Sequence, residues 1–72
     1  MIEKIIATVS EALGVPVTEA TTQLNCEQWD SLSHLNIVIA IEDVFEVSFE
    51  PEEFTRMNTI KDIEALLTSK KH

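Results

Sequence analysis

The segment from Ser31 to Glu46 constrains the fold most, because its apolar residues form two stripes at helical spacing. At about 100° per residue, one stripe gathers on a single helix face and comprises Ile37, Val38, Ile41, Val44 and Phe45, with Ala40 at its edge. Three further apolar residues fall on the opposite face: Leu32, Leu35 and Ile39. Since a helix of a small bundle needs only one apolar stripe to join the core, we expect the first stripe to be buried. The second, which we call the outer strip, is expected to face solvent.

Acidic and polar residues surround the outer strip, namely Asn36, Glu42, Asp43 and Glu46. An exposed apolar strip with a polar rim typically marks a docking surface. The alternative is a helix buried on both faces, which a chain of 72 residues has little material to cover. We therefore expect partners to dock on Leu32, Leu35, Ile39, Glu42, Asp43 and Glu46.

The helix is expected to begin at Asp30-Ser31, because a short carboxylate at the N-cap accepts hydrogen bonds from free backbone N–H groups. Ser31 would then lie at the positive end of the helix dipole, where a phosphate group is stabilised. Taken alone, the pair is most simply a helix cap. Ser31 becomes a candidate modification site because of the helix that follows it.

A first helix is predicted over Ile2–Leu13 from its apolar spacing, with Gly14 as its C-cap. The long connection that follows is expected to be fixed to the core by Val17 and Leu24. Trp29 ends this connection, and we interpret it first as a cap on the core, with a groove lining as the other possibility.

The second half of the chain predicts one short and one longer helix. Pro51 suits the first position of the short helix, and Thr59 with Asp62 forms a capping pair for the last. Lys70 and Lys71 suit the negative C-terminal end of that helix. The inward-facing residues are expected to be Phe49, Phe54, Met57, Ile60, Ile63, Leu66 and Leu67.

Length and charge restrict the classes of function. Seventy-two residues predict one domain, 1–72, and no apolar run is long enough for a membrane span. The formal net charge of −8 argues against nucleic acid, which requires basic surface, and favours basic protein partners. Because the N-terminus lacks the order of segments found in signal peptides, we expect a complete, cytoplasmic chain, and a monomer.

Residues for catalysis or metal binding are sparse. Cys26 is the single cysteine and has no basic neighbour to lower the pKa of its thiol. His34 and His72 are too few for a zinc site, so no metal is expected. No Ser-His-Asp or Cys-His arrangement is evident, and we expect no enzymatic activity.

The motif Asp30-Ser31-Leu32, placed after a long loop and before an acidic, apolar helix, resembles the serine motif of the acyl carrier proteins. With Trp29 it is similar to stand-alone carriers that read Trp-Asp-Ser-Leu. The resemblance covers essentially the whole chain. It implies an all-α four-helix bundle with three longer helices and one short helix. It also implies that Ser31 carries a covalent 4′-phosphopantetheine arm, on which acyl groups ride as thioesters.

The resemblance further implies a phosphopantetheinyl transferase and acyl-loading or acyl-transferring enzymes as partners, in fatty acid, other lipid or polyketide-type biosynthesis. Ser33 and Asn36 are neutral where many fatty-acid-synthesis carriers are acidic, which favours a carrier with fewer partners. One alternative is an aminoacyl, peptidyl or D-alanyl carrier, although Trp29-Asp30 and the net acidity favour the acyl type. The other is a carrier-like interaction module that is never modified.

Overall fold

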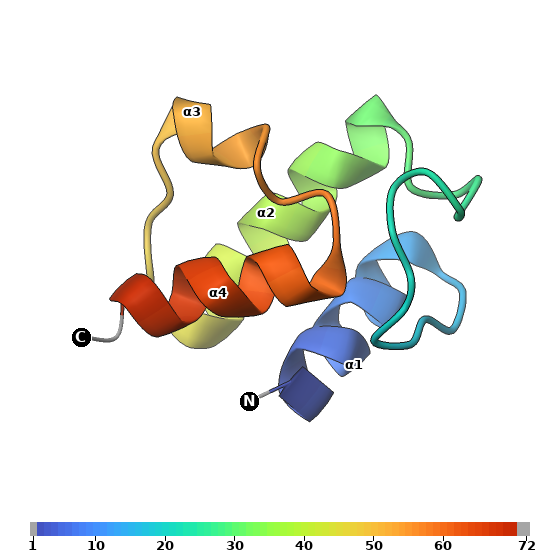
Figure 1. Cartoon of the computed structure of the whole chain (residues 1–72), viewed down its shortest axis with the longest axis horizontal. Helices are drawn as coiled ribbons and strands as arrows, with labels where there is room; N and C mark the ends of the chain where they lie inside the picture. Colours follow the sequence, from blue (N-terminus) through green and yellow to red (C-terminus); the bar gives the residue numbers. More distant parts are fainter. Residues whose placement is uncertain (1, 71–72) are drawn as a thin grey trace.

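The computed structural model describes residues 2–70, which form four helices. In chain order these are α1 (Ile2–Leu13), α2 (Ser31–Phe45), α3 (Pro51–Phe54) and α4 (Ile60–Lys70) (Figure 1). This is the predicted all-α bundle of three longer helices and one short helix. None of the described helices combines the length and the apolarity needed to cross a membrane.

The predicted cap of α1 is confirmed. Gly14 follows the helix with φ of 75°, and its N–H donates to the carbonyl of Ser10 at 2.8 Å. Glycine adopts this left-handed conformation without the steric penalty of a Cβ atom. The chain therefore leaves α1 at the position where the sequence predicts the turn.

The N-caps of α2 and α4 are also those that the sequence predicts, whereas the C-terminal end of α2 differs by one residue. The Asp30 carboxylate accepts from the Ser33 N–H at 2.8 Å, and the Thr59 hydroxyl accepts from the Asp62 N–H at 2.9 Å. The end of α2 lies at Phe45, one residue earlier than expected. It ends there because Glu46 adopts a left-handed backbone with φ of 55° and serves as the C-cap.

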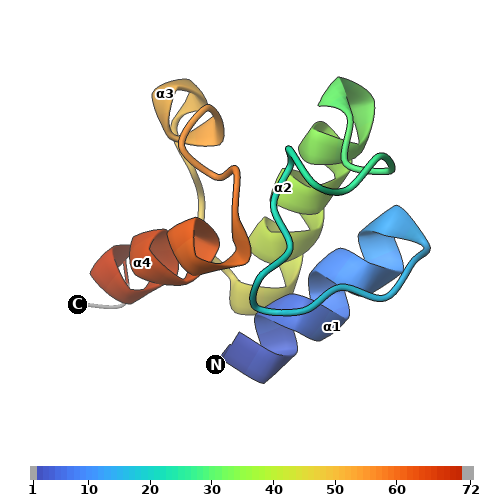
Figure 2. The same ribbon diagram turned by 45° about the vertical axis from the view of Figure 1, so that its right-hand side comes forward.

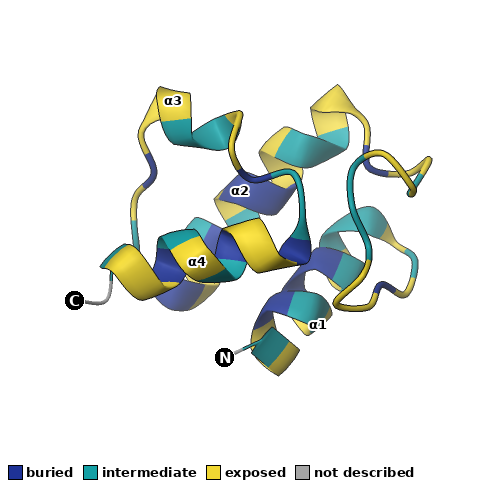
Figure 3. Cartoon of the chain, in the orientation of Figure 1, coloured by how far each residue is buried: buried dark blue, intermediate teal, exposed yellow. Residues whose placement is uncertain are grey.

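The core lies where α1 packs against α2 and α4 (Figures 1 and 2). Figure 3 shows buried positions along α1, α2 and α4, whereas α3 has none. Trp29 is 1% exposed, so its interpretation as a core cap is confirmed. The core residues are Ile5, Val9, Val17, Trp29, Ile37, Val38, Ile41, Phe45, Phe49, Met57, Ile60, Ile63 and Leu67, with Leu66 and Phe54 packed against them.

The expectation that Leu24 fixes the long connection to the core is wrong, because its side chain is 99% exposed. Hydrogen bonds around it hold the turn in another orientation. The Thr22 hydroxyl accepts from the N–H groups of Leu24 and Asn25, both at 3.2 Å, and Asn25 Oδ1 accepts from the Thr22 N–H at 2.9 Å. These bonds direct the leucine outward, while Val17 alone makes the predicted core contact at 7% exposure.

Val44 also departs from expectation, because 38% of its side chain is exposed despite its place on the inner stripe. It lies at the flank of α2 that faces α1, where Thr8 and Glu11 line the same hollow. Neither residue supplies a large apolar side chain to cover it, so the inner stripe is open along this edge.

An ion pair links α3 to α4, and a hydrogen bond links α3 to the connector that precedes it. Lys70 Nζ lies 2.9 Å from Glu53 Oε1 and 5.1 Å from the centre of the Phe49 ring. The same Glu53 oxygen accepts from the Glu50 N–H at 2.8 Å. Lys70 thus supports the short helix, and Lys71, predicted to act with it, lies outside the described residues.

The long connection between α1 and α2 pairs with the connector between α3 and α4. Thr22 and Thr59 form an isolated antiparallel bridge, and the Gln23 N–H donates to the Asn58 carbonyl at 2.8 Å. This pairing brings the loop and the α3–α4 connector together near the first turn of α2.

Candidate functional site

Ser31 occupies the first position of α2, and it is exposed. Asp30, immediately before it, turns its carboxylate to the Ser33 N–H. That backbone hydrogen bond, with the Ser33 hydroxyl, holds the pKa of the Asp30 carboxyl below its ordinary value of 3.8. The site therefore combines a free hydroxyl with the N-terminal, positive end of a 15-residue helix.

A shallow hollow of about 290 Å³ adjoins Ser31, between α2 and α3. Its apolar lining comes from Leu35 and Phe54, which are separated in sequence but lie on facing elements. The remaining lining residues are polar or aromatic and come from the loop, α2 and the region after α3: Gln23, His34, Thr55 and Asn58. Ser31 is itself one of the residues that line the hollow.

His34 joins three segments around the serine. Its Nδ1 lies 2.9 Å from the indole Nε1 of Trp29, and its Nε2 lies 2.6 Å from the Phe54 carbonyl oxygen. The indole ring of Trp29 and the imidazole ring of His34 stack with their centroids 6.3 Å apart. Sequence reasoning missed this role, because no sequence signal places the Phe54 carbonyl beside a histidine 20 residues away.

The outer strip is exposed, as predicted. Leu32 is 72% exposed, Leu35 is 47% and Ile39 is 62%, whereas Ile37 and Ile41 on the opposite face are fully buried. The alternative of a helix buried on both faces is therefore excluded. Three large apolar side chains lie along one solvent-facing line that begins one residue after Ser31.

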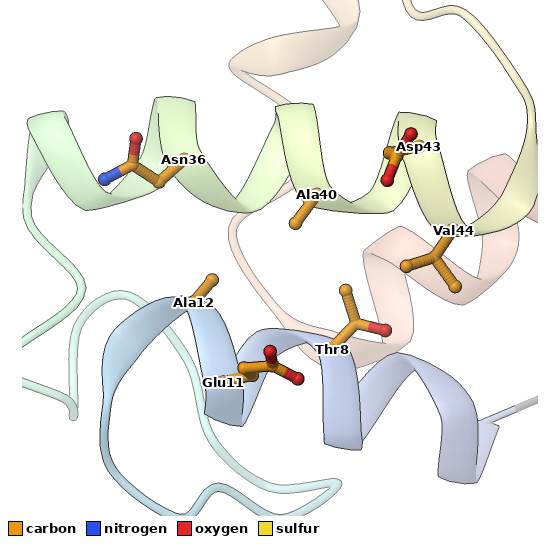
Figure 4. Close-up of a pocket in the computed structure, with 7 residues that line it drawn as sticks. All are labelled: Thr8, Glu11, Ala12, Asn36, Ala40, Asp43 and Val44. Atoms are coloured by element: carbon orange, nitrogen blue, oxygen red, sulfur yellow. The ribbon is translucent and has the colours of Figure 1, made fainter.

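The acidic rim of the outer strip is divided between the two flanks of α2. Asp43 faces a hollow of about 390 Å³ between α1 and α2, together with Glu11 of α1 (Figure 4). Glu42 lies toward the connector that follows α2, where its Oε2 accepts from the Phe49 N–H at 2.8 Å. Glu46 is exposed at the end of the helix. The predicted rim residues therefore have different local partners.

Other reactive groups are scattered. Cys26 is free and half-buried, with its Sγ 3.7 Å from Gln28 Oε1. Within residues 2–70, no group of three or more His, Cys, Asp or Glu side chains is placed to hold a metal ion. The site that the structure assembles is thus the exposed serine, its cap, the hollow and the outer strip.

Comparison with known proteins accounts for this arrangement. Residues 3–67 match the family described as "Phosphopantetheine attachment site". An acyl carrier protein from a species of Exiguobacterium is 31% identical over 65 residues, which cover 86% of this chain and 82% of the relative. Proteins of this kind are carriers without catalytic activity of their own. The chain therefore belongs to the acyl carrier protein family, as a non-enzymatic carrier with a covalently attached 4′-phosphopantetheine group.

Proposed function

We propose that Ser31 is the attachment site and that the protein carries acyl groups for lipid or polyketide-type biosynthesis. The observation that supports this most directly is an exposed serine at the first position of α2, beside an open hollow. Residues 1–72 would act as one carrier domain.

The residues present fit a phosphodiester at this position. The Ser31 hydroxyl is exposed, and the end of α2 that carries it favours negative charge through its dipole. The neighbouring Asp30 carboxylate is bonded to the Ser33 N–H. It serves as a cap and leaves the serine oxygen accessible to a transferase.

In the proposed reaction the Ser31 oxygen attacks the phosphorus next to pantetheine in coenzyme A. A new P–O bond forms, the pyrophosphate bond breaks, and 3′,5′-ADP leaves while the serine proton passes to a base of the transferase. Ser31 needs no base within this chain. Once attached, the arm supplies a terminal thiol that holds acyl groups as thioesters, and tethering raises their effective concentration at each client enzyme.

The outer strip is the proposed docking surface for the transferase and for acyl-loading or acyl-transferring enzymes. Leu32, Leu35 and Ile39 supply apolar contact next to the serine. Asp43 and Glu46 supply exposed charge, and the net charge of −8 favours association with basic partners. Glu42 is the least available of the predicted docking residues, because it is half-buried and bonded to Phe49.

Intact-mass measurement after incubation with coenzyme A and a broad-specificity transferase tests the attachment site. We expect the wild-type chain to gain one phosphopantetheine group and Ser31→Ala to gain none. Ser33→Ala is the matched control, because it removes a nearby hydroxyl on the same helix turn and should leave modification intact. A modified Ser31→Ala chain, or a wild type that several transferases leave unmodified, would overturn the proposal.

The class of cargo requires a separate experiment. The residues Trp29-Asp30 before the serine and the net acidity support an acyl carrier over an aminoacyl, peptidyl or D-alanyl carrier. Loading of the modified chain with acyl and with aminoacyl donors should therefore favour the acyl donors. Preferential aminoacyl loading would assign the protein to the other class, and a chain that is never modified would be an interaction module.

A further inference from the structure

We propose that His34 is a positioning residue for the Ser31 site, and that it acts as the neutral imidazole with its proton on Nε2. In this form it holds Trp29 and the C-terminal end of α3 on either side of the serine. The inference rests on the proposed role of Ser31 and adds a residue that determines how that serine is presented.

The hydrogen-bond geometry determines the tautomer. An indole N–H can only donate, so His34 Nδ1 must accept from Trp29 Nε1 at 2.9 Å and cannot carry a proton. A carbonyl oxygen can only accept, so Nε2 must donate to the Phe54 carbonyl at 2.6 Å. Both bonds exist together only in the neutral Nε2–H form. Protonation of Nδ1 would remove the acceptor and leave the indole N–H of a side chain that is 1% exposed without a partner.

The groups bridged by His34 are the ones that flank the serine. Trp29 immediately precedes the Asp30 cap, and Phe54 is the last residue of α3 and lines the hollow beside Ser31. Phe54 packs against the core and Glu53 is paired with Lys70, so α3 has contacts besides this bond. The bond from His34 adds a direct link between α3 and the first turn of α2.

Charged groups near this bridge are few. The hollow that His34 shares with the loop, α3 and the α3–α4 connector contains no ionisable side chain besides the imidazole. Asp30 precedes it on the approach to α2, with its carboxylate bonded to Ser33. On the α3 side, Glu53 is paired with Lys70, and Arg56 follows in sequence.

The tautomer and its loss are measurable without any modification of Ser31. Long-range ¹H–¹⁵N spectra of the ¹⁵N-labelled chain should show His34 as the Nε2–H tautomer at neutral pH. Trp29 is the single tryptophan, so intrinsic fluorescence reports directly on its contact with His34. We expect the emission to change when His34 is replaced. His72→Gln, which removes the other histidine of the chain, should leave the emission unchanged.

Two variants separate the two hydrogen bonds. His34→Asn places an amide oxygen near the Nδ1 position and can keep the Trp29 bond, whereas His34→Gln places an amide N–H near Nε2 and can keep the Phe54 bond. Both should remain folded at 20 °C by circular dichroism, and the emission of Trp29 should change more in His34→Gln, which lacks the acceptor at Nδ1, than in His34→Asn. In transferase kinetics we expect the KM for the carrier to rise roughly five-fold in each variant, with kcat little changed. The reason is that only the fraction of molecules with an ordered site would bind.

Each result bears on a distinct claim. A protonated Nδ1 at neutral pH, or Trp29 emission that neither His34 variant changes, would overturn the tautomer and with it the inference. Unchanged KM in both variants would overturn the positioning role. A wild type that no transferase modifies would contradict the proposed function of Ser31, while the spectra would still decide the state of His34.

Discussion

Glu42 accepts a hydrogen bond from the backbone N–H of Phe49 at 2.8 Å, and this bond ties the last turn of α2 to the connector that leads to α3. The next residue, Asp43, faces the hollow between α1 and α2 instead. Two adjacent carboxylates on a predicted docking surface thus have different roles. Glu42 supports the fold, whereas Asp43 remains exposed.

The first prediction compares Glu42→Ala with Asp43→Ala. Removing the Glu42 carboxylate leaves the Phe49 N–H without its acceptor, and we expect a loss of about 1–3 kcal/mol in the free energy of unfolding. Asp43→Ala should change it by no more than about 0.5 kcal/mol, but it should slow association with a basic transferase at low salt. Urea unfolding and stopped-flow binding measure the two effects. Glu42→Gln keeps an acceptor oxygen and should restore most of the stability; equal losses in both alanine variants would contradict the division of roles.

A second prediction concerns Ile39 and Ile41, which lie two residues apart on opposite faces of α2. Ile41 is fully buried, so Ile41→Ala should leave a cavity and cost about 2–5 kcal/mol of folding stability. Ile39 is 62% exposed, so Ile39→Ala should shift the melting temperature little and should instead slow transfer of the arm to Ser31. Thermal melts and transferase kinetics on both variants check this. Normal transfer kinetics in folded Ile39→Ala would show that partners dock elsewhere.

The third prediction follows from the lowered pKa of Asp30. Because the Ser33 N–H stabilises the ionised carboxylate in the folded state, the unfolded chain binds more protons near the ordinary value of 3.8. The contribution of Asp30 to stability is therefore complete above that value and is lost as pH falls through the lower folded-state pKa. We expect Asp30→Ala to be less stable than wild type at pH 7, with the difference narrowing below pH 3.8. Urea unfolding from pH 7 to 2.5 measures this, and a constant difference would contradict it.

The fourth prediction concerns the whole surface. Thirteen acidic residues exceed five basic ones, so the excess carboxylates should repel one another in the folded state. We expect the melting temperature at pH 7 to rise with NaCl and with millimolar Mg²⁺ or Ca²⁺, because each reduces the repulsion. A melting temperature that is indifferent to all of them would show that the acidic groups are too far apart to interact.

Local chemistry made much of this fold predictable from sequence. Gly14, Asp30 and Thr59 mark helix ends because their caps depend on residues no more than four positions away. Burial of the inner stripe of α2 followed from helical periodicity, apart from Val44. Leu24 could not be placed, since its direction depends on how the Thr22 turn bonds and on the pairing of the loop with residues near position 58.

The candidate site was predictable only in part for the same reason. Ser31 and the outer strip are properties of one helix, so the sequence places them on their faces. The bridge through His34 requires the Trp29 indole and the Phe54 carbonyl to meet, and this depends on the position of α3. That position is determined by contacts between segments far apart in the chain, such as the ion pair of Glu53 and Lys70.

Because α3 has four residues and none of them is buried, we expect it to open locally more readily than α1, α2 and α4. Its amide protons should therefore exchange with solvent well before those of the core helices.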